Sequence, residues 1–133
     1  MEMATTGYFE FSSDKWGTTQ ANKLELTEDG PAYRVLAKRE VGKSMEWFYL
    51  DFPKREGKHT FVFSELLAVK YLFRSDDYTF RFTGKSGSLT ATSVGGAVAV
   101  TGTFNFEMTA DPDSDSQGPK TLSITNGKFD LKN

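Results

Sequence analysis

One phrase recurs three times in this chain of 133 residues: a glycine followed by large apolar residues at alternating positions. Alternation with a period of two places the apolar side chains on one face of a pleated strand and the polar ones on the other. The phrase therefore predicts three amphipathic strands and indicates no reaction. Its copies are Thr6-Gly7-Tyr8-Phe9-Glu10-Phe11, Thr101-Gly102-Thr103-Phe104-Asn105-Phe106 and Asn126-Gly127-Lys128-Phe129-Asp130-Leu131.

Short alternating segments of the same kind recur along the whole chain, separated by turn residues such as Glu28-Asp29-Gly30-Pro31 and Val94-Gly95-Gly96. Many short strands without a long helical pattern predict an all-β domain spanning residues 1–133. We expect an antiparallel β-sandwich or a flattened up-and-down barrel of about 8 to 10 strands. The expected strands are 6–11, 22–27, 32–40, 45–52, 58–64, 69–74, 77–84, 88–93, 97–109 and 120–132.

Three places leave alternatives for the local structure. Ser64 can cap a short helix, so one helical turn near 64–68 is expected before strand 69–74. Gly84-Lys85-Ser86-Gly87-Ser88 is interpreted as a hairpin turn. Asn126-Gly127 fits a two-residue hairpin turn or a glycine bulge within one long strand, and the hairpin is slightly preferred.

Composition limits the class of protein. The chain is long enough to bury a core without disulfides or metal ions, and 14% of its residues are aromatic. No apolar stretch is long enough to cross a bilayer, and Met1-Glu2-Met3-Ala4 has no signal-peptide character. A soluble protein is expected. The absence of cysteine fits a cytoplasmic protein or a secreted one whose signal peptide has been removed, so the compartment stays open.

Charge is unevenly distributed. Residues 34–85 carry 11 basic and seven acidic side chains, whereas the chain as a whole has a net charge of −2. The basic residues could form an anion-attracting patch if they share a face, or they could be solvated lysines that protect strand edges. The acidic sequence pI of about 5.4 argues against a nucleic-acid partner.

The C-terminal part of the chain resembles a known family. Gly87-Ser88-Leu89-Thr90, Gly102-Thr103-Phe104-Asn105-Phe106 and Ile124-Thr125-Asn126-Gly127-Lys128-Phe129 follow one another as in small all-β proteins of bacteria, mostly secreted lipoproteins of Bacteroidetes. The resemblance covers about a third of the chain. It implies a topology and no chemistry, because that family has no assigned function. This chain lacks the lipoprotein cysteine.

The inventory of reactive side chains argues against an enzyme. The single histidine, His59, is the only imidazole available for nucleophilic catalysis, and one imidazole without a thiolate cannot build a zinc or iron site. Asp111, Asp113 and Asp115 alternate as in a calcium loop, but the glycine and glutamate of that loop are missing. We therefore expect no catalytic residues, no cofactor and no metal.

One segment is apolar at nearly every position. Residues 45–52, Met-Glu-Trp-Phe-Tyr-Leu-Asp-Phe, predict a central strand whose second face also packs against something. Because aromatic rings dominate recognition energies, Trp47, Tyr49 and Trp16 are the candidate ligand- or partner-binding residues. The function expected is non-catalytic binding, with protein–protein contact slightly favoured and the oligomeric state open.

An alternative function is a barrel of the lipocalin or avidin type that holds a small apolar or sugar-like ligand. Size and strand number resemble that class, although its Gly-x-Trp motif on the first strand is missing. This alternative predicts a pocket lined by six rings: Trp47, Tyr49, Phe61, Phe63, Tyr78 and Phe80.

Overall fold

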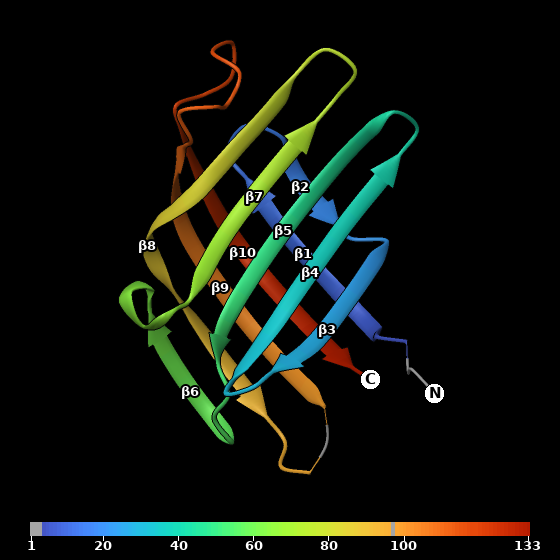
Figure 1. Ribbon diagram of the computed structural model, residues 1–133, viewed down its shortest axis with the longest axis vertical. Coiled ribbons are helices and arrows are strands. Elements are labelled where there is room, and N and C mark those ends of the chain that lie inside the picture. Colours follow the sequence, from blue (N-terminus) through green and yellow to red (C-terminus); the bar gives the residue numbers. More distant parts are fainter. Residues whose placement is uncertain (1–3, 97) are drawn as a thin grey trace.

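The computed structural model describes residues 4–96 and 98–133 as ten antiparallel strands and one short 3-10 helix (Figure 1). Residues 1–3 and Ala97, the first residue of the expected strand 97–109, lie outside the described residues. The all-β prediction is confirmed. The elements are β1 (Thr6–Ser13), β2 (Gly17–Gln20), β3 (Lys23–Asp29), β4 (Ala32–Val41), β5 (Ser44–Pro53), β6 (Gly57–Val62), η1 (Phe63–Glu65), β7 (Ala68–Arg74), β8 (Thr79–Ser93), β9 (Ala99–Ala110) and β10 (Thr121–Lys132).

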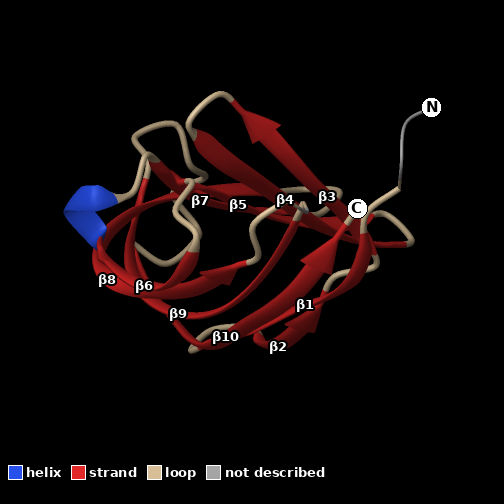
Figure 2. Cartoon of the chain, turned by 90° about the horizontal axis from the view of Figure 1, so that it is seen from below, coloured by secondary structure: helices blue, strands red, loops and turns tan. Residues whose placement is uncertain are grey.

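The strands form one sheet that folds over itself. Their order is β2-β1-β10-β9-β8-β7-β5-β4-β3, and β6 pairs with β8 off this path. Figure 2 shows two facing layers, with β3, β4, β5 and β7 in one and β1, β2, β9 and β10 in the other. Strand β8 joins them, because Thr79–Arg81 lie beside β7 and Ser88–Ser93 lie beside β6. A bulge between Gly84 and Ser86 separates the two halves of β8 and allows the bend.

The sheet is not closed into a barrel, so the flattened barrel is wrong and the two-layered alternative holds. Strands β2 and β3 are its edges. Side chains bridge the seam between β1 and β3: the Leu26 N–H donates to Thr5 Oγ1 over 2.9 Å, and Asn133 Nδ2 donates to the Leu26 carbonyl over 2.9 Å. These bonds satisfy edge groups of β3 that no neighbouring strand reaches.

The recurring glycines have a cross-strand role. In the β9–β10 register Gly102 lies opposite Phe129, and Gly127 lies opposite Phe104. A Cβ atom at Gly127 would lie 2.4 Å from Phe104 Cε2, and one at Gly102 would lie 2.6 Å from Phe129 Cζ. Each glycine therefore makes room for the phenylalanine ring of the neighbouring strand.

Two predicted turns are wrong. Asn126-Gly127 lies inside β10, where a register shift between Ile124 and Gly127 and a φ of 53° at Asn126 identify a bulge. The preferred hairpin fails because β10 pairs with β1 on one side and β9 on the other, and both pairings continue past this point. Likewise residues 84–88 belong to the continuous strand β8 and form no hairpin.

Other local expectations are close to the observed structure. The expected helical turn is the 3-10 helix η1, one residue earlier than predicted. Strand β2 has no counterpart among the expected strands, because its residues Gly-Thr-Thr-Gln include no large apolar side chain.

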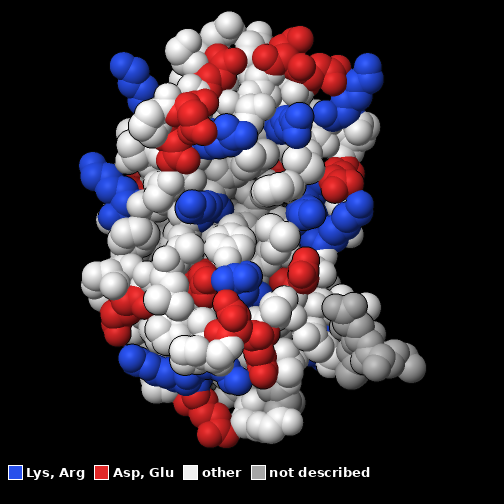
Figure 3. All heavy atoms as spheres, in the orientation of Figure 1, with Lys and Arg blue, Asp and Glu red and all other residues white. Residues whose placement is uncertain are grey.

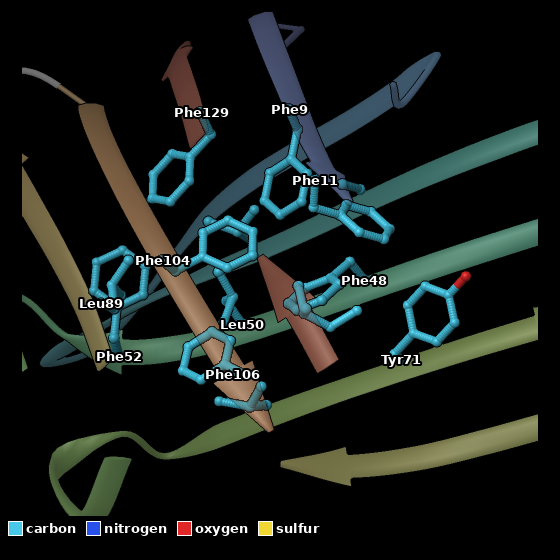
Figure 4. Close-up of a cluster of buried hydrophobic side chains, with 14 of the residues drawn as sticks. Phe9, Phe11, Phe48, Leu50, Phe52, Tyr71, Leu89, Phe104, Phe106 and Phe129 are labelled. Atoms are coloured by element: carbon cyan, nitrogen blue, oxygen red, sulfur yellow. The ribbon is translucent and has the colours of Figure 1, made fainter. Parts of the chain in front are cut away.

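Aromatic rings fill the space between the layers (Figure 4). Phe48 of β5 lies with its ring centroid 5.2 Å from that of Phe104 and 5.7 Å from that of Phe9. Phe9 in turn stacks on Phe129 at 5.6 Å. All four are at most 2% exposed. The predicted inward stripes on β1, β9 and β10 are therefore the core of the protein.

Candidate functional site

Strand β5 carries apolar side chains on both of its faces, as its sequence predicts. Phe48, Leu50 and Phe52 point into the core and are at most 1% exposed. Trp47 and Tyr49 alternate with them and lie half-buried on the outer face of the layer. Since β5 lies between β4 and β7, these two rings occupy the middle of a sheet face rather than an edge.

The sheet register sets two rows of side chains across this face. Trp47 lies between Lys38 of β4 and Leu72 of β7, and Leu72 is followed by Arg81 of β8. The next row places Tyr49 between Leu36 and Lys70. The two rows line a hollow of about 710 Å³. We call it the outer-face groove, defined by Leu36, Trp47, Tyr49, Lys70, Leu72 and Arg81.

Cationic side chains flank both rings. Lys38 Nζ lies 5.1 Å from the centroid of the Trp47 ring, and the Arg34 guanidinium lies 5.8 Å from that of Tyr49. Figure 3 looks onto this face and shows uncharged atoms in its middle with lysine and arginine side chains on either side. Such contacts hold cations against aromatic faces and orient the rings.

The loop between β9 and β10 forms a wall beside β8. Arg81 Nη1 and Asp113 Oδ2 form an ion pair at 2.9 Å, and Thr83 Oγ1 donates to Asp111 Oδ1 over 2.6 Å. The Asp111 N–H donates to the Arg81 carbonyl over 2.8 Å. The wall is thus fixed by side-chain and backbone contacts, and it bounds the outer-face groove at its β8 end.

Three buried polar atoms on this face have no hydrogen-bond partner among the described residues: Arg34 Nε, Trp47 Nε1 and Asp51 Oδ1. Arg34 and Asp51 lie opposite each other on β4 and β5, and their nearest ion-pair distance is 3.5 Å. Leaving a buried donor or acceptor unpaired costs about 1–3 kcal/mol. The face is therefore less well satisfied than the core behind it.

Tyr49 stays a neutral hydrogen-bonding group over a wide pH range. Burial, together with the nearby Asp51 carboxylate, raises the pKa of the Tyr49 phenol above its ordinary value. A phenol with a raised pKa keeps its proton at neutral pH and can donate to an oxygen of a bound molecule.

The structure separates the third candidate, Trp16, from the other two. Trp16 lies in the turn between β1 and β2 and stacks on Phe73 with centroids 4.8 Å apart, and it also stacks on Phe80 at 5.8 Å. These rings belong to the partly buried rim of the core. Trp16 thus closes one end of the space between the layers, whereas Trp47 and Tyr49 share the outer-face groove.

The six rings expected around one internal pocket do not line a common space. Phe61 is 2% exposed within the core, and Phe80 contacts Trp16 and Tyr78 at the rim. Trp47 and Tyr49 project from the opposite face of the sheet because side chains alternate along β5.

Several residues of the groove escaped sequence reasoning. Leu36 and Leu72 interrupt the alternation of β4 and β7 with consecutive apolar residues, the same signal that marks 45–52. Lys38, Lys70 and Arg81 give no such signal. Their positions follow from which strands are neighbours and in which register, and this information is not local to the sequence.

The other candidate chemistry is occupied by structural contacts. His59 Nε2 lies 2.8 Å from the Glu56 carbonyl oxygen. Within residues 4–96 and 98–133 no group of three or more histidine, cysteine or acidic side chains could hold a metal ion. The carboxylates of the expected calcium loop instead contact separate partners, Asp113 binding Arg81 and Asp111 binding Thr83.

Comparison with known proteins adds no identification to the fold. Among the described residues, no helix has the length and apolar character needed to cross a membrane. No protein-family model, curated protein or solved structure matches the chain. The chain is an all-β protein built on one antiparallel sheet.

Proposed function

We propose that the protein is a non-catalytic binding module that holds a partner protein in the outer-face groove. The observation that carries this proposal is the position of Trp47 and Tyr49, half-buried on the outer face of a central strand, with the Trp47 Nε1 donor unpaired among the described residues. Tryptophan and tyrosine are enriched among the residues that dominate binding energy, because one ring combines a large apolar area with a polar atom.

The surroundings of the rings favour binding over catalysis. Both carboxylates in the wall of the groove, Asp111 and Asp113, accept a hydrogen bond or an ion pair from β8. A general acid or base needs an available proton acceptor within hydrogen-bond reach of its substrate. The resemblance of the C-terminal third to small Bacteroidetes β proteins is likewise a proposal, and it concerns topology alone.

A second candidate occupant is a small sugar-like ligand in the same groove. The volume of about 710 Å³ favours it, since small-molecule sites usually measure about 300–1,000 Å³. Aromatic faces beside hydrogen-bonding groups also suit a sugar ring. This proposal replaces the internal barrel pocket as the place where a ligand would lie.

Native mass spectrometry of protein purified gently from the cells that produce it tests the proposal. We expect the wild type to carry a second polypeptide, the double variant Trp47→Ala/Tyr49→Ser to lose it, and the control Tyr8→Ser to keep it. Tyr8 is a suitable control because it is 50% exposed on β1, in the other layer.

Three other outcomes are decisive. A polypeptide retained by the Trp47/Tyr49 variant would place the contact elsewhere and contradict the proposal, and so would a bare wild-type monomer. A constant extra mass of a few hundred daltons, lost on denaturation, would identify the small ligand instead. Circular dichroism spectra of all variants show whether the fold is retained.

A further inference from the structure

The cations around the outer-face groove differ in whether their charge is already balanced. Arg34 pairs with Asp29 at 3.0 Å and with Asp51 at 3.5 Å, and Arg81 pairs with Asp113 at 2.9 Å. Lys38 and Lys70 form no ion pair with the described residues. The groove therefore presents two unbalanced positive charges beside its two rings.

The register places these two lysines diagonally on either side of β5. Lys38 on β4 lies opposite Trp47, and Lys70 on β7 lies opposite Tyr49. They are two strand spacings apart across the sheet and two residues apart along it, which gives about 12 Å between their Cα atoms. The rings of Trp47 and Tyr49 lie between them.

We infer that the partner presents an extended segment with two acidic residues four positions apart and an apolar residue midway between them. An extended chain advances about 3.3 Å per residue, so residues four apart span about 13 Å and point to the same side. The carboxylates then meet Lys38 and Lys70 while the apolar side chain meets the rings. This inference rests on the proposed function and names the chemistry of the partner.

The same face disfavours a basic segment. A lysine or arginine of the partner would approach two unbalanced ammonium groups, and like charges in contact are a strong source of discrimination against wrong partners. Carboxylate–lysine pairs at a partly exposed surface also weaken as salt is added. Binding of the acidic segment should therefore decrease with ionic strength.

Selection from a random peptide library displayed on phage tests the inference with a defined probe. The immobilised target is the full chain, and the Trp47→Ala/Tyr49→Ser variant serves for counter-selection. We expect the retained peptides to be enriched in the pattern acidic-x-apolar-x-acidic. Their affinity should fall about 3- to 30-fold in the double variant Lys38→Gln/Lys70→Gln.

A matched control removes the same charge elsewhere. Lys58 on β6 and Lys120 in the loop before β10 are exposed and form no ion pair with the described residues, so Lys58→Gln/Lys120→Gln lowers the net charge equally outside the groove. We expect it to leave the affinity within about twofold of the wild type. An equal loss in both double variants would mean that only the overall charge matters, and it would overturn the inference.

The outcomes separate this inference from the function on which it rests. Peptides that require Trp47 and Tyr49 but show no acidic enrichment, or that bind the Lys38→Gln/Lys70→Gln variant as well as the wild type, would overturn the acidic partner and leave the groove as a binding site. A library that yields no peptide dependent on Trp47 and Tyr49 would contradict both.

Discussion

Glu46 shows how a single residue of β5 can face inward without a cationic partner. Its Oε2 atom accepts a hydrogen bond from Thr19 Oγ1 at 2.7 Å and one from the Tyr71 hydroxyl at 3.1 Å. Tyr71 is 2% exposed, and burial together with the Glu46 carboxylate raises the pKa of its phenol well above the ordinary value. The phenol therefore remains a donor to this carboxylate at every pH at which the protein is folded.

Removing that donor should destabilise the protein. We expect Tyr71→Phe to lower the free energy of unfolding by about 1–3 kcal/mol, because the partly buried carboxylate loses one of its two hydrogen-bond donors. Urea denaturation measures the change. The control Tyr8→Phe removes an exposed hydroxyl and should change the unfolding free energy by less than about 0.5 kcal/mol. Equal effects of the two variants would show that the Tyr71–Glu46 bond contributes nothing.

At the scale of the element, the glycines of the recurring phrase shape the pair β9–β10. The rings of Phe104 and Phe129 are 2% and 1% exposed, and each covers the glycine on the opposite strand. Gly127→Ala should therefore destabilise the protein by about 1–3 kcal/mol through overpacking against the Phe104 ring. Chemical denaturation provides the measurement.

A double-mutant cycle isolates the cause of that effect. If the new methyl group collides with the ring, Gly127→Ala should cost clearly less in a Phe104→Leu background than in the wild type. The same cost in both backgrounds would point to the backbone of the bulge and contradict the packing explanation.

Strands were predictable from the sequence to the extent that their information is local. The stripes that contain Phe9, Phe104 and Phe129 follow from alternation alone. The hairpin expected at Asn126-Gly127 failed because the pairing of β10 with both β1 and β9 decides between turn and bulge, and this pairing is non-local. The same holds for the bend of β8 at Gly84.

The candidate site was predictable in part for the same reason. Alternation along residues 45–52 places Trp47 and Tyr49 on one face, as the structure shows. It cannot bring Lys38 and Lys70 to their sides, because that arrangement depends on the order β7-β5-β4. Nor does it assign Trp16, whose place at the rim of the core is set by the turn after β1.

At the scale of the whole molecule, one sheet separates two environments. Its inner face packs phenylalanine rings across the fold, and its outer face carries the groove over β4, β5 and β7 (Figures 1 and 4). The edges are managed separately, with Thr5 and Asn133 bonded to the backbone of Leu26 at the seam. Binding is therefore expected on the outside of the sheet, while the interior supplies stability.

The two tryptophans report on these two environments. The indole N–H of Trp47 belongs to the outer-face groove and that of Trp16 to the rim of the core, so their two resonances in a ¹⁵N-correlation spectrum distinguish the sites. Trp47→Phe and Trp16→Phe assign the two signals. The decisive measurement is a titration of the ¹⁵N-labelled protein with an acidic peptide selected from the library.

We predict that the Trp47 indole signal shifts progressively as peptide is added, while the Trp16 signal stays in place. A shift of Trp16 with Trp47 unchanged would place binding at the rim of the core, and no shift of either would show that the groove binds no such segment. Both results would contradict the account.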